Sequence, residues 1–343
     1  GNRSIFSRKL QELMTDRLNK GQQTILFLNR RGYAGFVSCR SCGEVMKCPH
    51  CDVSLSEHKG GRLICHYCGY TQPMPKLCPK CGSKYILGFK AGTQQIEEKL
   101  KELYPGVRTL RMDADTTRTK DSYEKILSSF ANGEADVLIG TQMIVKGHDF
   151  PKVTLVGILA ADLSLNASDY RAGERTFQLL TQAVGRAGRG VLPGEAVIQT
   201  YQPDHYAITC AAAQDYESFY QEEILYRELS GYPPVAHMLA VQIYGKEEEN
   251  VKQLALRLTD VVKSNMDFLS GKQKEQSNKK IQVLGPAPAN ISKINDIYRY
   301  VFYVKHAEYD VLVEVKDRLE ETLRQWQPRQ MSIQFDFDPV SVL

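Results

Sequence analysis

Eight of the nine cysteines lie in one short stretch and form four Cys-x-x-Cys pairs, a pattern that can bind metal. The pairs are Cys39 with Cys42, Cys48 with Cys51, Cys65 with Cys68, and Cys78 with Cys81. Two thiolates separated by two residues can grip a tetrahedral ion, and two such pairs complete a closed site. The spacing therefore predicts two structural Zn²⁺ ions, with an iron–sulfur cluster or redox dithiols as the alternatives.

The four pairs can be combined in three ways, and the spacing favours the nested one. Thirteen residues separate the second pair from the third, as in an ordinary zinc ribbon, so one ion would be held by Cys48, Cys51, Cys65 and Cys68. The other ion would be held by Cys39, Cys42, Cys78 and Cys81, and would clamp the base of the segment. A crossed pairing is the main rival.

A second group of residues suits the chemistry of phosphate transfer. Gln182, Arg186 and Arg189 are spaced i, i+4 and i+7, so on a helix they would share one face. Two guanidinium groups on one face fit the oxygens of a γ-phosphate, as arginine fingers do. We therefore expect these three residues to serve catalysis, against the alternative of a basic helix end favoured by the helix dipole.

Two further segments place polar groups where a sheet binds ligands. The segment 140–151 follows a predicted strand, and backbone N–H groups at such a turn can hold a phosphate. We expect Thr141 and Lys146 to contact a nucleic-acid backbone and Asp149 to bridge to a nucleotide ribose or to an arginine, with an ordinary β–α turn as the alternative. Arg30 and Arg31 end the first predicted strand and are candidates for the same role.

The elements that must position these groups alternate between strand and helix. Strands are predicted at 24–28, 107–112, 137–139, 154–159 and 196–200, with helices at 5–20, 94–103, 121–130 and 175–184. This order predicts an α/β fold with a parallel, doubly wound sheet, and the cysteine segment interrupts it after the first strand. Residues 205–230 are expected to be helical, and 237–337 to follow the ferredoxin-like order β-α-β-β-α-β.

Composition excludes several classes of protein. The 343 residues carry a formal net charge of only +4, so any basic surface for nucleic acid must be local. Charged residues make up 24% and hydrophobic residues 42%, which is typical of a soluble globular chain of two or three domains. No apolar run is long enough for a membrane span, and neither a signal peptide nor an initiator Met is present, so we expect a fragment.

Taken together, these motifs resemble the second RecA-like lobe of superfamily 2 helicases. The order Asn29-Arg30-Arg31-Gly32-Tyr33, then 140–151, then 182–190, with eight cysteines inserted after the first motif, narrows the resemblance to the PriA family. The resemblance covers essentially the whole chain. It implies a RecA-like lobe over 1–37 and 89–204, an inserted two-zinc module over 38–88, a helical connector over 205–235, and a C-terminal ferredoxin-like domain over 236–343.

The family resemblance also implies a function. Such proteins are bacterial, cytoplasmic and nucleoid-associated 3′→5′ DNA helicases that use ATP and Mg²⁺. They recognise branched forks and single strands and load primosome proteins, and single-strand-binding protein is a further candidate partner. The resemblance implies that one set of residues contacts the DNA backbone and couples that contact to ATP, namely Thr141, Gln142, Lys146, His148 and Asp149. The sequence has no G-x-x-x-x-G-K-[ST] motif, so we expect this chain alone not to hydrolyse ATP. The alternative is a non-enzymatic adaptor that binds DNA or protein on a helicase-like scaffold.

Overall fold

The structure is a computed structural model in which most of the chain is described. The described residues are 4–28, 37–49, 54–58, 61–65, 69–88, 92–113, 116–117, 120–141, 144, 150–167, 169–264 and 280–340. None of the described helices combines the length and the hydropathy that a bilayer crossing requires.

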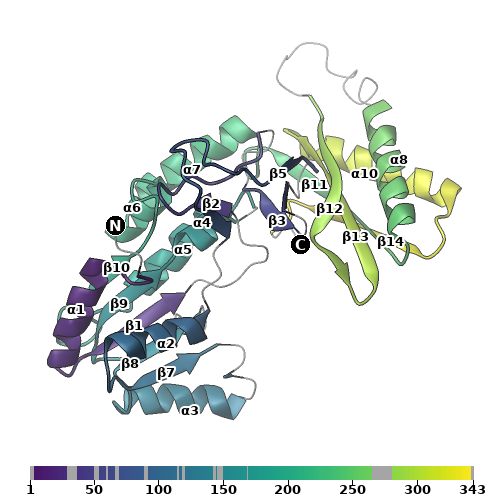
Figure 1. Cartoon of the computed structure of the whole chain (residues 1–343). Helices are drawn as coiled ribbons and strands as arrows, with labels where there is room; N and C mark the ends of the chain where they lie inside the picture. Colours follow the sequence, from purple (N-terminus) through teal and green to yellow (C-terminus); the bar gives the residue numbers. More distant parts are fainter. Residues whose placement is uncertain are drawn as a thin grey trace.

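A five-stranded parallel sheet organises the first half of the fold, as the alternating pattern predicted (Figure 1). Its order is β10-β9-β1-β8-β7, with every neighbouring pair parallel. The strands are β1 (Gln23–Leu28), β7 (Thr109–Met112), β8 (Val137–Gly140), β9 (Val153–Leu159) and β10 (Glu195–Ile198). The first strand along the chain therefore lies in the middle of the sheet.

Helices cover both faces of this sheet, and the residues of β1 show why. Ile25 and Phe27 pack in one hydrophobic cluster, while the alternate residues Leu26 and Leu28 pack in another. The second cluster includes α1 (Arg8–Asn19) and α2 (Thr93–Leu103). The first includes α3 (Lys120–Ala131), α4 (Asp162–Leu165), α5 (Ala172–Val184), α6 (Tyr206–Ala213) and α7 (Tyr216–Ser230). Because successive strand residues point to opposite faces, six buried residues in a row require cover on both sides.

The region predicted to be helical over 205–230 contains two helices. The first, α6, ends at Ala213, its C-cap residue Gln214 adopts a left-handed conformation at φ 56°, and the Asp215 side chain then caps the N-terminus of α7. The bend lets both helices pack beside α5.

The cysteine segment carries small antiparallel sheets of its own between β1 and α2. One joins β2 (Val37–Cys39) to β6 (Ile86–Gly88), which holds the two ends of the segment together. The other contains β3 (Ser56–His58), β4 (Arg62–Ile64) and β5 (Thr71–Pro73). Figure 1 places β3 and β5 between the parallel sheet and the C-terminal sheet.

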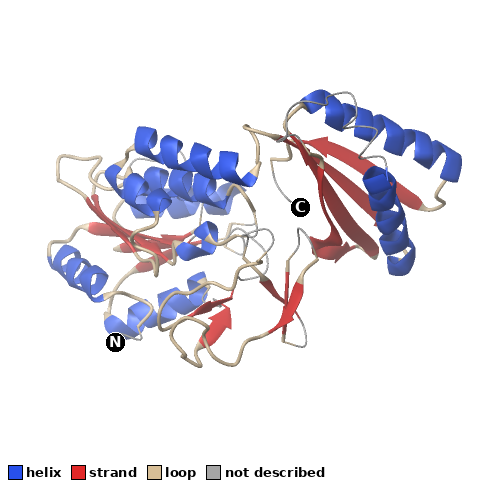
Figure 2. Ribbon diagram, turned by 90° about the horizontal axis from the view of Figure 1, so that it is seen from above, coloured by secondary structure: helices blue, strands red, loops and turns tan. Residues whose placement is uncertain are grey.

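The C-terminal part has the predicted order β-α-β-β-α-β. Its elements are β11 (His237–Gly245), α8 (Glu248–Ser264), β12 (Gln282–Ile294), β13 (Ile297–His306), α10 (Tyr309–Trp326) and β14 (Met331–Phe337). They form an antiparallel sheet of order β12-β13-β11-β14, and α8 and α10 cover one face (Figure 2).

The opposite face of this sheet joins the cysteine segment in a shared core. Met238, Ala240, Val301 and Tyr303 from the sheet pack in one cluster with Leu55, Leu63 and four cysteines. The cluster also contains Tyr170, from the loop before α5, and Tyr232, which follows α7. All three parts of the chain therefore meet in one apolar junction.

Candidate functional site

Four of the predicted ligands converge on a single point. The sulfur atoms of Cys39, Cys42, Cys78 and Cys81 all lie within 4.8 Å of one another. The Sγ atoms of Cys39 and Cys81 are 3.6 Å apart, and those of Cys42 and Cys78 are 3.7 Å apart. A tetrahedral zinc with Zn–S bonds of about 2.3 Å separates its sulfurs by about 3.8 Å. The spacing and the donor set therefore fit Zn²⁺, and the grouping is the one that the nested pairing requires.

The backbone around these cysteines forms repeated, nearly identical turns. The N–H of Cys39 donates to the carbonyl of Glu44 at 2.8 Å, and the N–H of Gly43 donates to the carbonyl of Cys39 at 2.9 Å. The same pair of hydrogen bonds recurs around Cys65 and around Cys78. Each turn ends in a glycine with positive φ, namely Gly43, Gly69 and Gly82. A Cys-x-x-Cys-Gly sequence thus builds the tight turn that points two sulfurs at one ion.

The thiols of this cluster favour a bound cation. Burial alone would raise the pKa of Cys39, but the backbone N–H groups of Ser41 and Cys42 lower it to about 6. The pKa of Cys42 is raised instead, because a hydrogen bond from the backbone N–H of Glu44, which lowers it, is outweighed by desolvation and by the neighbouring sulfurs of Cys81, Cys78 and Cys39. The first proton is therefore lost easily, whereas further ionisation places like charges side by side. A divalent cation removes that repulsion and allows all four thiols to bind as thiolates.

The second predicted site is only partly within the described residues. Cys48 and Cys65 are both buried in the junction core. Cys51 and Cys68 lie outside the described residues, so the geometry of this set of four is not given by the structure.

The prediction that Gln182, Arg186 and Arg189 share one helix face is wrong. The α5 helix ends at Val184, and both arginines lie in the non-helical segment that begins at Gly185. Glycines recur through this segment, and Gly188 adopts φ 72°, which an α-helix cannot accommodate. Gln182 and Arg189 are exposed and Arg186 is half-buried, while the Nε of Arg189 donates to the carbonyl of Gly185 at 2.8 Å.

Backbone contacts hold this glycine-rich loop in place. The N–H of Gly188 donates to the carbonyl of Val153, at the start of β9. A Cβ added to Gly188 would lie 2.4 Å from the backbone nitrogen of Gly194, and one added to Gly190 would lie 2.4 Å from the carbonyl oxygen of Pro151. The loop is therefore fixed against the end of the segment 140–151, which joins two of the predicted motifs in space.

The remaining predicted residues are less completely described. Thr141 lies directly after β8, where its N–H donates to the carbonyl of Met112 at 3.3 Å. The other residues predicted in that segment and in the first strand lie outside the described residues, namely Gln142, Lys146, His148, Asp149, Arg30 and Arg31.

A buried ionic network near the junction was not predicted from the sequence. The guanidinium of Arg227 contacts the carboxylates of Glu223 and Glu174 and donates to the carbonyl of Pro233 at 2.8 Å. Its side chain is only 3% exposed. The same guanidinium lies 4.8 Å from the centre of the Tyr170 ring. The i, i+4 spacing of Glu223 and Arg227 was the one available signal, but exposed helix pairs share it.

Aromatic stacking extends this network into the C-terminal sheet. The ring of Tyr170 stacks on that of Tyr232, with centroids 4.7 Å apart and planes inclined by 8°. The ammonium of Lys305, on β13, lies 4.0 Å from the centre of the Tyr232 ring. The ammonium of Lys305, the rings of Tyr232 and Tyr170, and the guanidinium of Arg227 therefore follow one another from β13 to α7.

Comparison with known families matches three parts of the chain. A family model described as "PriA DNA helicase Cys-rich region (CRR) domain" matches residues 48–73. One described as "Helicase conserved C-terminal domain" matches residues 77–191, and one described as "Primosomal protein N C-terminal domain" matches residues 228–340.

Curated relatives match the chain from end to end. It is 44% identical over 345 residues to "Replication restart protein PriA" of Bacillus subtilis, a match that covers 100% of this chain and 42% of the relative. The protein of the same description from Synechocystis sp. is 42% identical over 347 residues, covering 100% of this chain and 40% of the relative. The chain therefore spans less than half the length of these relatives.

Among solved structures, one match is the C-terminal domain of the DEAD-box protein Dbp5. It is 12% identical to this chain, with a TM-score of 0.31, and the match covers 64% of this chain and 89% of that one.

Proposed function

The chain belongs to the PriA family, as a C-terminal part of such a protein, and from this premise we propose that it works within an ATP-dependent 3′→5′ DNA helicase that restarts replication. The observation that carries the proposal is the end-to-end similarity to replication restart proteins, because it includes all three matched regions in one order. The alternative of a non-enzymatic adaptor is not favoured, since the helicase family model covers the glycine-rich loop itself.

We assign the ATP-facing role to Gln182, Arg186 and Arg189. Gln182 lies in the last turn of α5, and Arg186 and Arg189 lie in the loop that follows it. This arrangement still suits a contact across an interface, because Gln182 and Arg189 are exposed. The close backbone packing of Gly188 and Gly190 supports the assignment, because it fixes the backbone of Arg189, the residue between them. ATP and Mg²⁺ would be held in the longer protein, and the arginines would stabilise charge on the transferred phosphate.

The segment 140–151 would couple DNA binding to that event. We propose that Thr141, Gln142, Lys146, His148 and Asp149 contact the DNA backbone or transmit its presence, together with Arg30 and Arg31. The packing of Pro151 against Gly190 supports this coupling, because a shift of either loop would reach the other directly.

We propose two structural zinc ions. The first is held by Cys39, Cys42, Cys78 and Cys81, whose sulfur spacing fits it. The second is assigned to Cys48, Cys51, Cys65 and Cys68, on the ground of the Cys-x-x-Cys spacing and the cysteine-rich family match. Since all eight ligands are thiolates, neither site would offer an open position for catalysis.

The proposed domains are a RecA-like lobe over 1–37 and 89–204, the zinc module over 38–88, a helical connector over 205–235 and a ferredoxin-like domain over 236–343. The strand order β12-β13-β11-β14 with two helices on one face supports the last assignment. Branched and single-stranded DNA are the proposed substrates, and primosome proteins and single-strand-binding protein the proposed partners. The proposed setting is the bacterial cytoplasm, at the nucleoid.

Unwinding by a PriA-family protein that contains this chain would test the proposal. A branched duplex with a fluorophore on one arm should lose that arm in an ATP-dependent reaction, with 3′→5′ polarity on the bound strand. Unwinding of the opposite polarity, or none at saturating ATP, would contradict it. A blunt duplex without a branch is the matched control substrate.

A further inference from the structure

The loop that carries Arg189 also carries an apolar tip, formed by Val191 and Leu192. Val191 is 103% exposed, more than any other large apolar side chain among the described residues, and Leu192 is 45% exposed. The residues from 190 to 194 are all uncharged. Neither tip residue was assigned a role by the sequence motifs. Single exposed apolar residues are common on protein surfaces, so exposure alone does not identify a contact surface.

The backbone of this loop holds the tip away from the core. A Cβ on Gly188 or on Gly194 would overlap the backbone of the other, so the two ends of the loop 188–194 lie against each other. Gly190, within the loop, lies against the carbonyl of Pro151. A loop that is closed and packed in this way cannot fold its tip back onto the chain. Both tip side chains therefore stay in water until a partner covers them.

Arg189 shares this closed loop with the tip. It lies between Gly188 and Gly190, whose backbone is fixed, and its side chain is exposed. Val191 follows two residues later, and two residues of chain span at most about 7 Å. A partner that reaches the guanidinium of Arg189 is therefore within reach of the tip as well.

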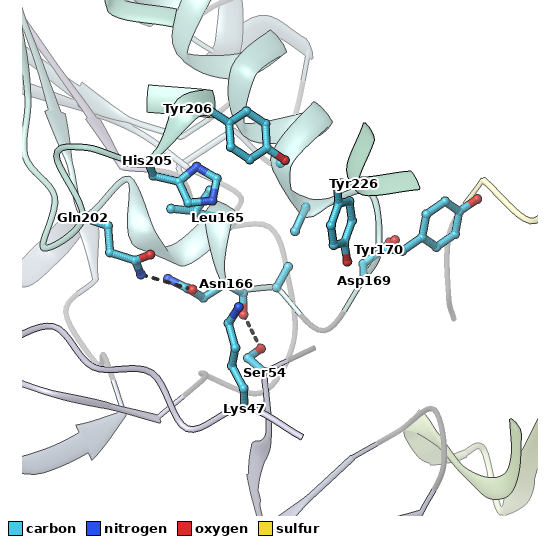
Figure 3. A pocket seen from close by; sticks show the side chains of 13 residues that line it. Lys47, Ser54, Leu165, Asn166, Asp169, Tyr170, Gln202, His205, Tyr206 and Tyr226 are labelled. Carbon is cyan, nitrogen blue, oxygen red and sulfur yellow. Dashed lines mark hydrogen bonds between the residues drawn. The ribbon is translucent and has the colours of Figure 1, made fainter. Parts of the chain in front are cut away.

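The other end of α5 is already enclosed by this chain. Ala172 and Gly173, in its first turn, line a polar cavity of about 250 Å³. Figure 3 shows Tyr206, from α6, and Lys47, from the cysteine segment, on opposite sides of that cavity. The loop with the tip follows the opposite end of α5, where residues 191–195 are all exposed. Among the described residues, this is the end of α5 that leaves room for a partner.

The remainder of the longer protein is the occupant that these observations favour. This chain matches only 42% and 40% of the length of two PriA relatives. The proposed function places ATP in that remainder, facing Arg189. A DNA backbone is a less suitable occupant, because it binds through cations and residues 190–194 carry none. The chemistry of the tip instead fits an apolar protein surface.

We propose that Val191 and Leu192 dock on an apolar surface of the part of the longer protein that holds ATP, beside the phosphate that Arg189 contacts. The proposal rests on the proposed function, since that function places ATP opposite this loop. Covering the tip excludes water from the neighbourhood of the transferred phosphate and holds the two parts of the protein together. Because the contact is the same before and during phosphate transfer, it contributes to the KM for ATP rather than to kcat.

Hydroxyl-radical footprinting of the longer protein, with a non-hydrolysable ATP analogue bound, measures whether the tip is covered. Leu192 should be oxidised severalfold more slowly there than in the 343-residue chain. Leu103, the last residue of α2, is the matched control, because it is 44% exposed and should be oxidised at the same rate in both. Equal rates for Leu192 in the two proteins overturn the proposal. Oxidation of Leu192 that slows in the 343-residue chain as its concentration rises assigns the tip to a second copy, and also overturns it.

The variant Leu192→Ser in the longer protein separates this contact from catalysis. It should raise the KM for ATP about fivefold or more, as the loss of a buried apolar contact does, and leave kcat within about twofold. Leu103→Ser should alter neither quantity. A fall in kcat with an unchanged KM, or no change in either, overturns the proposal. A longer protein that protects Leu192 but hydrolyses no ATP overturns the proposed function and not the docking contact.

Discussion

Replacing Arg227 by methionine should destabilise the junction strongly, because it leaves a buried carboxylate without its partner. The Glu223 side chain is 10% exposed and contacts the guanidinium of Arg227, and it also accepts from the hydroxyl of Tyr206 at 2.7 Å. Removing one partner of a buried ion pair costs about 3–5 kcal/mol. Because 1.4 kcal/mol is a factor of ten, amides of α7 should lose about two to four orders of magnitude of protection.

Native-state hydrogen exchange of the α7 amides measures this loss at the place where it arises. Lys99→Met is the control, since the Lys99–Glu102 pair is exposed on both sides and should contribute less than about 1 kcal/mol. The double variant Glu223→Gln with Arg227→Met removes both charges and should recover most of the protection. Equal protection in Arg227→Met and Lys99→Met, or a double variant as unstable as the single one, would refute this reasoning.

Three further outcomes follow from the same structure. Gly188→Ala should lower the free energy of unfolding by several kcal/mol in thermal unfolding, because the added Cβ would lie 2.4 Å from a backbone nitrogen. Gly82→Ala, at a similar φ of 71° but with open space around it, should cost only about 1 kcal/mol. Equal losses of stability in the two variants would contradict the packing argument. Cys39→Ser should reduce bound zinc from two ions to one by metal analysis, while Cys210→Ser should leave two; retention of two ions in Cys39→Ser would refute the ligand set. In the wild type, the free energy of unfolding should fall between pH 6.5 and about 4, because the unfolded imidazole of His205 takes up a proton in that range and the folded one does not. In His205→Asn this fall should be smaller. Parallel plots of the free energy of unfolding against pH for the two proteins would contradict the inferred titration of His205.

The parallel sheet could be predicted because its strands are short apolar runs separated by clear helical patterns. In β1 all six residues are buried, so the run of hydrophobic residues reports burial on both faces directly. The break between α6 and α7 could not be predicted in this way, since the residue in the left-handed conformation is Gln214 and not a glycine. The local signal there is Asp215, a preferred helix N-cap residue, but without a glycine or proline before it the pattern does not mark the end of α6.

For the candidate site too, some features could be predicted from the sequence and others could not. The outer four cysteines were those left once a ribbon-like spacing had favoured one ion for the inner four, and the crossed pairing stayed open until the structure brought the outer sulfurs together. The prediction of one helix face for Arg186 and Arg189 was wrong because their spacing is that of a helix, whereas the helix ends before them. Gly185 follows the last helical residue, and the further glycines keep the segment from continuing as a helix. The junction network depends on Glu174 and Arg227, which are 53 residues apart, and nothing in the local pattern links such a pair.

The most direct test of the account is ATP turnover by a PriA-family protein that contains this chain with Arg189→Ala. Arginine fingers contribute about 10³–10⁵ to turnover in related chemistry. The account predicts that DNA-stimulated hydrolysis falls by at least about 10³ while fork binding stays unchanged, and that Gln178→Ala, an exposed change on α5, alters neither. Hydrolysis that survives Arg189→Ala at the wild-type rate would contradict the assignment of the glycine-rich loop to the ATP site.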